Sequence, residues 1–409
     1  MTIRPRSLYV CYFGLRQPLV QTQVLPYLRE LVAGGIEMSL LTFEPELKKS
    51  WNAGSITEWR QRLRDDGIEW HVLPYHKRPS LTATGYDIFA GARRALAIAR
   101  RQKIDVFHGR SHVGAAIGAL AKRRTGARLI FDVRGFLAEE YVDSGNWKAG
   151  GLLYRLTKSV EQWFYRASDG FIVLTERARE TLFPEGAAGR PVEVIPCCVD
   201  QERFAAASRC DRDAVREELG VGGRLVFIYV GVLGGYYLIR EMAEFLAVAR
   251  EQDARVYAIV LTQASPASII EELNRLGFSN DDYRVTQVAP EEVPKYLRAS
   301  DIGLSLIRPS YARRSMSPTK VAEYLAAGLP IIATAGIGDL DTDIDQARVG
   351  VLLRSFDRAA YAAAFHAVEA LRRDTALAER CRGQARARYD LHTVGGKRYL
   401  RLYDSVLRA

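Results

Sequence analysis

The residues best suited to chemistry lie in one stretch, 315–334, which reads SMSPTKVAEYLAAGLPIIAT. Ser317 is expected to be the N-cap of a helix with Pro318 at its first position, because both residue types are favoured there. The free amides of that helix start, the hydroxyls of Ser317 and Thr319 and the ammonium of Lys320 would form a site for an anion such as a diphosphate. The alternative is a plain helix cap beside a solvated lysine.

Glu323 follows the expected anion site by one helical turn. A carboxylate there could accept two hydrogen bonds from vicinal ribose hydroxyls, as acidic residues do in other nucleotide sites. The alternative is a charge on the helix surface. On the first interpretation, the stretch is a nucleotide diphosphate site.

A glycine-rich turn offers a second phosphate-binding element. Residues 229–238 read YVGVLGGYYL, and Gly231, Gly234 and Gly235 stand between an expected strand and a helix that begins near Arg240. Glycines let backbone amides approach a phosphate without an obstructing Cβ atom. The turn lacks the G-x-G-x-x-G spacing and so does not indicate a dinucleotide site. Ordinary turn chemistry is the alternative.

Polar residues near expected strand ends form a third candidate group, in the first half of the chain. Gly14 and Gln23 lie between a strand and a helix, and His108, Asp132 and Arg134 lie where later strands are expected to end. Ligands of open α/β sheets bind at the carboxyl ends of the strands. We therefore expect these residues on the acceptor side of a site, with structural hydrogen bonding as the alternative for each.

These candidates depend on strands that alternate with helices along the chain. Short runs of β-branched and aromatic residues indicate buried parallel strands, and the longer stretches between them have helical patterns. The expected strands are Ser7–Phe13, Glu37–Phe43, Trp70–Tyr75, Asp105–His108, Arg128–Val133, Phe171–Thr175, Val192–Pro196, Leu225–Val230, Arg255–Leu261, Tyr283–Val288, Ile302–Ile307, Pro330–Thr334 and Gly350–Leu353. This order predicts doubly wound α/β sheets.

A polar segment, Asp200–Gly223, separates two such series of strands. A chain of 409 residues also exceeds what one hydrophobic core usually organises. We expect a first Rossmann-like domain at 1–200, a second at 201–385, and a basic helical tail at 386–409 that packs back onto the first domain. The two domains would face each other across a ligand-binding crevice.

Composition excludes several classes of protein. The five cysteines include no C-x-x-C pair, which favours a reducing cytoplasm over a disulfide framework or a zinc site. No segment approaches the roughly 18 apolar residues of a membrane span, and the N-terminus lacks a signal pattern. The net charge of +10 comes from scattered basic pairs without a nucleic-acid motif, so no nucleic-acid partner is expected.

Together these stretches resemble the GT-B glycosyltransferases of the large retaining family 4, which builds bacterial exopolysaccharide and other surface glycans. The motifs fall in family order along nearly the whole chain, at 21–28 (QTQVLPYL), 131–136 (FDVRGF), 173–176 (VLTE), 194–200 (VIPCCVD) and 318–330 (PTKVAEYLAAGLP). The resemblance implies a GT-B fold and transfer of a hexosyl or N-acetylhexosaminyl group from a nucleotide sugar. The implied acceptor is a glycan or a polyprenyl-diphosphate-linked molecule.

The resemblance also implies roles for single residues. Glu323 matches the second glutamate of the family's E-x7-E motif and should hold the donor ribose, whereas Ser315 stands in place of the first glutamate. The basic residues that usually follow the glycine turn are absent, and Lys320 would supply their charge. Arg134 stands where many relatives carry a histidine. With His108 and Lys320 it forms the expected catalytic set.

The implied mechanism is direct transfer with retention, in which the helix dipole, backbone amides and Lys320 absorb the charge of the leaving group. No metal and no cofactor would then be required. Asp339, Asp341 and Asp343 lie in a loop whose polar surroundings favour a solvated turn over a magnesium site. The alternative function is a catalytically silent partner that binds nucleotide sugar, because Ser315 replaces a motif glutamate.

A peripheral contact with an anionic membrane, at the inner face of the cytoplasmic membrane, is expected through the first domain. Scattered arginines such as Arg123 and Arg124 would attract anionic lipid. The segment 151–166 places Leu152, Leu156 and other apolar residues at helical spacing. If exposed, that face would lie in the lipid interface, but ordinary packing on the sheet is the favoured interpretation of this helix.

Overall fold

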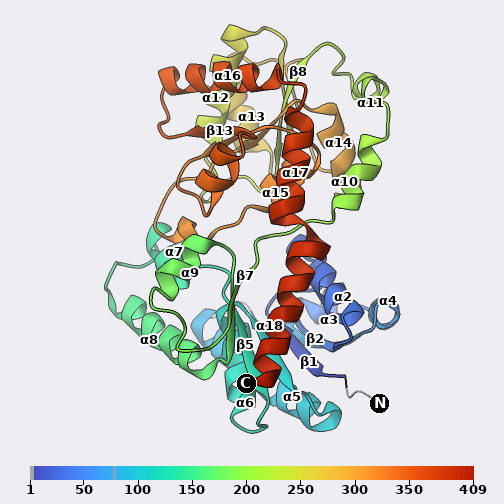
Figure 1. The fold of residues 1–409 in the computed structure, drawn as a ribbon, viewed down its shortest axis with the longest axis vertical. Coiled ribbons are helices and arrows are strands. Elements are labelled where there is room, and N and C mark those ends of the chain that lie inside the picture. The colour runs from blue at the N-terminus through green and yellow to red at the C-terminus, as the bar shows by residue number, and fades with distance from the viewer. Residues whose placement is uncertain (1–3, 77, 79) are drawn as a thin grey trace. The chain divides into compact units, whose positions relative to one another are not determined.

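The computed structural model describes residues 4–76, 78 and 80–409, and it divides the chain into two compact units. Unit 1 runs to Pro196 and also contains Leu391–Ala409, whereas unit 2 is Cys197–Asp390. The chain therefore passes from one unit to the other twice, as the colours of Figure 1 trace. The second boundary falls at 390 rather than the expected 385, because a helix of unit 2 continues to Tyr389.

Unit 1 is built on a parallel sheet with the strand order β3-β2-β1-β4-β5-β6-β7. Its strands are β1 (Arg6–Cys11), β2 (Glu37–Pro45), β3 (Ile68–Tyr75), β4 (Val106–Arg110), β5 (Arg128–Asp132), β6 (Gly170–Val173) and β7 (Val192–Val194). Apolar runs buried on both faces characterise such sheets, and Leu8, Val10, Phe107 and Leu129 lie in its core. The reversal of strand order beside β1 is the switch point of a doubly wound sheet.

Helices connect the strands of unit 1. They are α1 (Pro18–Gln23), α2 (Leu25–Ala33), α3 (Leu47–Ser50), α4 (Ala53–Asp65), α5 (Ser80–Gln102), α6 (Ser111–Lys122), α7 (Leu137–Asp143), α8 (Leu152–Ala167), α9 (Glu176–Leu182), the π-helical turn η4 (Leu391–Gly396) and α18 (Lys397–Arg408). The turn η4 and the helix α18 come from Leu391–Ala409, the second segment of unit 1. The connections have the β-α-β order that the sequence predicts.

Unit 2 repeats this architecture with the strand order β10-β9-β8-β11-β12-β13, again parallel. Its strands are β8 (Leu225–Val230), β9 (Val256–Leu261), β10 (Tyr283–Thr286), β11 (Ile302–Ser305), β12 (Ile331–Thr334) and β13 (Gly350–Leu353). Its helices are α10 (Gln201–Ser208), α11 (Arg212–Glu218), α12 (Ile239–Gln252), α13 (Ala267–Arg275), α14 (Val293–Ala299), α15 (Thr319–Ala326), α16 (Arg358–Arg372) and α17 (Leu377–Tyr389), with short turns η1 (Pro290–Glu292), η2 (Ala312–Ser315) and η3 (Asp341–Gln346). The expected α/β class is confirmed in both units.

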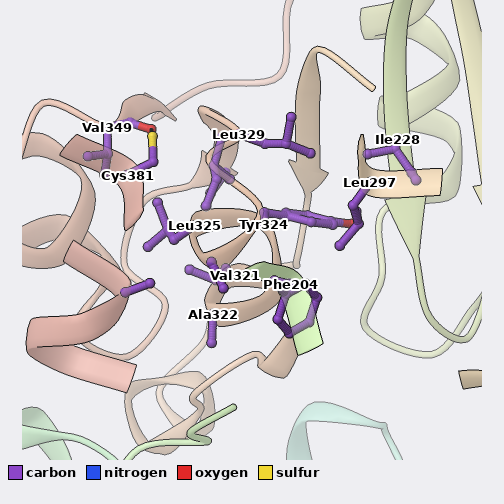
Figure 2. Packing of buried hydrophobic residues seen from close by; sticks show 14 of the residues in the cluster. Phe204, Ile228, Leu297, Val321, Ala322, Tyr324, Leu325, Leu329, Val349 and Cys381 are labelled. Atoms are coloured by element: carbon purple, nitrogen blue, oxygen red, sulfur yellow. Dashed lines mark hydrogen bonds between the residues drawn. The ribbon is translucent and has the colours of Figure 1, made fainter. Parts of the chain in front are cut away.

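Helix α15 is held tightly within unit 2. Val321, Tyr324 and Leu325 are fully buried and pack among side chains of neighbouring elements, as Figure 2 shows. The Tyr324 ring lies so close to β11 that a Cβ atom at Gly303 would come within 2.3 Å of it. The Tyr324 hydroxyl accepts a hydrogen bond from the Val230 amide at 2.9 Å. Packing and this bond fix the helix against the end of β8.

Helix α18 completes unit 1. Its buried face consists of Tyr399, Leu402, Tyr403 and Val406. Glycines make room for the helix: a Cβ atom at Gly170 would come within 2.5 Å of Val406. The apolar stripe of this helix therefore belongs to the core of unit 1.

Candidate functional site

The start of α15 differs from the expected cap. The helix begins at Thr319, its N-cap position is Pro318, and no side chain caps it. Ser317 Oγ instead accepts a hydrogen bond from the Cys197 amide at 3.0 Å. The expected N-cap role of Ser317 is therefore wrong, because a tertiary contact at the start of unit 2 takes up its hydroxyl.

Lys320, in the first turn of α15, is buried rather than solvated. Only 6% of the residue is exposed. Its ammonium lies 3.9 Å from the centre of the Tyr229 ring and 4.0 Å from that of Tyr237, an aromatic environment that favours a cation. Within the described residues, Nζ has no hydrogen-bond partner. Burial lowers the pKa of Lys320 to about 7.

The glycine-rich turn lies against this ammonium. Gly231 follows β8 with φ of 141°, and a Cβ atom there would stand 3.1 Å from Lys320 Nζ. Gly234 and Gly235 also have positive φ, and nothing lies within 4 Å of their Cβ positions. The fold therefore brings together the turn and the lysine, which the sequence separates by about 90 residues. Their predicted role in donor binding remains a prediction.

Glu323 lies one turn further along α15 and is partly buried. Burial raises the pKa of its carboxyl group to about 7, against smaller opposing effects of Arg203 and Lys320. The carboxyl group therefore holds its proton more tightly than an exposed glutamate does, and it changes charge near neutral pH. Bound hydroxyl donors, such as those of a ribose, would stabilise its carboxylate form.

The start of α15 thus combines several sources of positive potential. The first-turn amides have no partner inside the helix, and the helix dipole adds to the charge of Lys320. An anion at this point would give the buried ammonium the partner that it lacks. Ser315, where the resemblance would require a glutamate, is buried and donates its hydroxyl to the Ala312 carbonyl at 2.8 Å.

The sequence interpretation missed the aromatic residues of this site. The Tyr236 ring contacts that of Tyr237 in a tilted arrangement, and the Arg313 guanidinium lies 4.0 Å from the centre of the Tyr236 ring. Two adjacent tyrosines after a glycine turn were the available signal. Without the fold, nothing indicated that Tyr229 and Tyr237 would enclose the lysine of another element.

A second polar cluster lies in unit 1 around Asp132, at the end of β5. This buried carboxylate accepts hydrogen bonds from Arg134 at 3.3 Å, from Arg110 at 3.4 Å and from the Tyr9 hydroxyl at 3.3 Å. Arg110 ends β4 and is only 2% exposed. Asp132 thus ends its strand as expected and pairs with Arg134, while Arg110 is a member of the cluster that the sequence interpretation missed.

His108 does not lie where it was expected. It stands in the middle of β4 rather than at its end, and it is completely buried. Its Nδ1 atom lies 3.0 Å from the Tyr403 hydroxyl of α18, and its ring packs on Tyr9 and Tyr399. Burial lowers its pKa to about 4. The expected strand-end position is wrong, and the geometry gives His108 a packing role, the alternative considered from the sequence.

Gly14 and Gln23 occupy different surroundings. The Gln23 carbonyl accepts a hydrogen bond from Arg110 at 3.4 Å, so Gln23 adjoins the Asp132 cluster. Gly14 instead lies against the end of β2, where a Cβ atom would come within 2.8 Å of Glu44. The predicted acceptor-side role of both residues stays a prediction.

The acidic loop after β12 is also more structured than expected. Asp343 is buried and accepts hydrogen bonds from Arg388 at 2.9 Å and from Tyr389. Asp341 accepts a bond from the Gly336 amide at 2.8 Å. The expected solvated turn is therefore wrong for Asp343, which ties α17 to η3.

No helix of the described residues combines the length and apolar character that crossing a membrane requires. No group of three or more His, Cys, Asp or Glu side chains in that part of the chain could hold a metal ion.

Comparison with known proteins identifies both units. Residues 20–198 match the family described as glycosyl transferase 4-like domain, and residues 224–370 match the family glycosyl transferases group 1. Among curated proteins, a D-inositol 3-phosphate glycosyltransferase of Nocardia farcinica is 29% identical over 47% of this chain and 43% of its own length. A 2-deoxystreptamine glucosyltransferase of Streptomyces kanamyceticus is 29% identical over 45% of this chain and 47% of its own. The alignments span less than half of these relatives.

Solved structures share the fold along the whole chain. A glycosyltransferase from Rickettsia africae superposes with a TM-score of 0.74 at 15% identity, covering 99% of both chains. The Anabaena protein HepE, solved in complex with UDP and glucose, gives a TM-score of 0.69 at 16% identity and covers 97% of this chain and 99% of its own. With its two Rossmann-like sheets and the two matched families in this order, the chain belongs to the GT-B glycosyltransferases that join a glycosyl transferase 4-like domain to a group 1 domain.

Proposed function

We propose that this protein transfers a hexosyl or N-acetylhexosaminyl group from a nucleotide diphosphate sugar to a glycan or polyprenyl-diphosphate-linked acceptor, with retention, in exopolysaccharide or glycoconjugate synthesis. The observation that carries the proposal is the buried Lys320 ammonium, which lies against the Gly231 turn without a hydrogen-bond partner in the described residues. Leaving such a charge unpaired is costly, and a diphosphate would pair it. The solved complexes of HepE with UDP and with UDP-glucose support a uridine nucleotide as the first donor to test.

The reaction would require little covalent participation by the protein. The acceptor hydroxyl forms a bond to the anomeric carbon on the face from which the diphosphate departs. The bond between that carbon and the diphosphate oxygen breaks, and the hydroxyl proton passes to the departing diphosphate. Lys320 and the start of α15 stabilise the charge that develops on the diphosphate, which is where preorganised groups accelerate transfer most. We propose that neither a metal nor a cofactor takes part.

The acceptor is proposed as a class of molecule, a glycan or a polyprenyl-diphosphate-linked compound. The matched relatives are named for D-inositol 3-phosphate and for 2-deoxystreptamine, which differ in charge and size. The reaction is proposed to take place in the cytoplasm, at the inner face of the membrane. The second candidate function is a silent nucleotide-sugar-binding partner, favoured by Ser315, whose hydroxyl bonds Ala312 where the resemblance requires an acid.

The test measures both binding and turnover. We expect Lys320→Met to weaken UDP binding by about 1–3 kcal/mol, the usual cost of a lost charge-assisted hydrogen bond, while the methionine keeps the packing on the tyrosines. Glu323→Gln should weaken binding of UDP but not of inorganic diphosphate, because only UDP has a ribose. Lys295→Met, at a partly exposed lysine of α14, is the matched control. Unchanged affinity in both site variants would reject the site, and donor binding without nucleotide release across acceptors would select the silent partner.

A further inference from the structure

Helix α8 of unit 1 buries a charged side chain, Glu161, beside the apolar Phe164. Its inward face carries a polar network: Glu161, 2% exposed, accepts hydrogen bonds from His112 at 3.1 Å and from Lys158 at 2.7 Å. Lys158 also reaches Glu139 of α7 at 3.1 Å, and Tyr154 donates to the same carboxylate. The apolar residues from Leu152 to Val160 are not part of this buried side of the helix.

The outward face is an apolar stripe, Leu152, Leu153, Leu156 and Val160, which are 74%, 43%, 53% and 47% exposed. These positions recur at helical spacing and so form one continuous surface. Tyr141 of α7, 41% exposed, stacks on Trp147 in the segment leading to α8. Figure 1 shows α8 at the outer edge of unit 1. The expectation that the helix packs its apolar stripe on the sheet is therefore wrong for Leu152, Leu153, Leu156 and Val160. It is correct for Phe164, which is 3% exposed and packs against Phe131 of β5, and Trp163 also packs against the core.

Positive charge accompanies the stripe. Arg155 and Arg166 are exposed on α8, and within the described residues neither forms an ion pair; Lys148, just before the helix, is also exposed and unpaired there. The single acid of α8, Glu161, is the buried one. The outward surface of the helix is thus apolar and cationic, without a compensating acid.

The cationic surface continues beyond α8. Arg123, after α6, lies 5.0 Å from the centre of the Trp163 ring of α8. The next residue, Arg124, lines a pocket of about 540 Å³ with Arg100, Lys103 and Arg128. A second copy of the chain, docked by two-fold symmetry, would set such rows of like charge against one another. An anionic lipid surface complements both the charge and the apolar stripe.

We propose that α8 is a membrane-docking helix, whose stripe Leu152, Leu153, Leu156 and Val160 inserts between lipid headgroups while Arg155 and Arg166 contact anionic phosphates. The surface lies wholly in unit 1, so the inference goes beyond the proposed transfer reaction and does not rest on it. It assigns a lipid contact to a particular helix of the first unit.

The experiment measures co-sedimentation of the full chain with vesicles. Binding is expected to phosphatidylcholine vesicles that contain phosphatidylglycerol, and to weaken between about 0.1 M and about 1 M NaCl, over which the Debye length falls from about 10 Å to about 3 Å. The double variant Leu156→Gln, Val160→Gln should partition onto the vesicles more weakly, by about tenfold or more, because membrane affinity increases with the apolar area that is buried. The matched control replaces two exposed aromatic residues of α5, Tyr86→Gln and Phe89→Gln, and should bind as the wild type.

The charge is tested separately. Replacing Arg155→Gln and Arg166→Gln should remove the preference for anionic over neutral vesicles, whereas Arg60→Gln with Arg373→Gln, the same charge change at exposed sites elsewhere, should leave most of it. Wild-type protein that stays in the supernatant, or stripe variants that bind like the wild type, would overturn the proposal. A concentration-dependent dimer lost in the stripe variant, without vesicle binding, would replace it with a protein interface. UDP binding is measured on every sample, so that failure of the donor site is distinguished from failure of docking.

Discussion

At the scale of single residues, Lys320 is the side chain whose state depends most on a ligand. Burial lowers the pKa of Lys320 to about 7, and the Glu323 carboxylate acts in the opposite direction. A diphosphate beside Nζ would raise that pKa, because an opposite charge favours the protonated form. The lysine therefore links donor binding to proton uptake.

The sign of this linkage can be measured. At pH 8 the free protein holds Lys320 mostly neutral, and the bound protein holds it protonated, so UDP binding should take up as much as about one proton. Titration calorimetry in two buffers of different ionisation enthalpy reports that number. Lys320→Met should abolish the uptake at pH 8, and an identical uptake in the variant would assign the proton to another group.

Lys320 is proposed to neutralise the negative charge of the diphosphate, which a metal cation would otherwise neutralise. We therefore predict that transfer needs no metal. Transfer should persist in an excess of EDTA. The measurement is nucleotide release with and without the chelator, with a magnesium-dependent transferase as the positive control. Activity that disappears in EDTA and returns with magnesium would contradict the proposal.

At the scale of elements, α18 is anchored in unit 1 by an apolar face that contains the hydrogen-bonded Tyr403 hydroxyl. Arg398 and Arg401 of the same helix also donate hydrogen bonds to Val194 and Glu193 of β7. The Tyr403 hydroxyl lies 2.8 Å from Ser7 Oγ and 3.0 Å from His108 Nδ1. The hydroxyl of Tyr399, on the same buried face, has no hydrogen-bond partner within the described residues. The two tyrosines of this face thus differ in whether their hydroxyls are hydrogen-bonded.

This difference gives a matched pair of substitutions. Tyr403→Phe should lower the free energy of unfolding by about 1–3 kcal/mol, because it leaves Ser7 and His108 with unsatisfied buried groups. Tyr399→Phe should be neutral or stabilising, since it removes a buried hydroxyl that pairs with nothing. Urea unfolding of both variants is the measurement. Equal losses would mean that the contact of Tyr403 contributes nothing specific.

Some features of the strands and helices could be predicted from the sequence, and others could not. All thirteen expected strands occur, two of them, Leu225–Val230 and Gly350–Leu353, with the expected bounds, because runs of buried apolar residues are a local signal. The environment of His108 was not predictable, since it depends on α18, almost 300 residues away. Periodicity revealed the stripe of α8 but not its direction, which buried polar partners on other elements decide. In the candidate site, Lys320 and Glu323 were predicted, while the tyrosines around Lys320 required the fold.

At the scale of the whole molecule, each unit has its own core and its own polar cluster. The residues of the proposed donor site, Gly231, Lys320 and Glu323, all belong to unit 2, whereas Tyr403 and His108 belong to unit 1. A ligand stabilises only the part of a protein that binds it.

Scanning calorimetry should therefore resolve the two units. By mass action, UDP is expected to stabilise unit 2 against unfolding by about 2.7 kcal/mol at a concentration one hundred times Kd. The transition temperature of unit 2 should therefore rise, and that of unit 1 should stay unchanged. Tyr403→Phe should lower the transition temperature of unit 1 and leave that of unit 2 unchanged. A single transition that responds to both changes would show that the units unfold as one.

The path of the chain also has a consequence for synthesis. Unit 2 is continuous, but unit 1 needs α18, which leaves the ribosome after all of unit 2. Until then the polypeptide carries a complete second unit and a first unit whose sheet lacks one covering helix, with His108 not yet covered by Tyr399 and Tyr403. A chain truncated within α18 would thus retain the residues of the proposed donor site but have an aggregation-prone first unit, because the apolar surface beneath the helix would stay exposed.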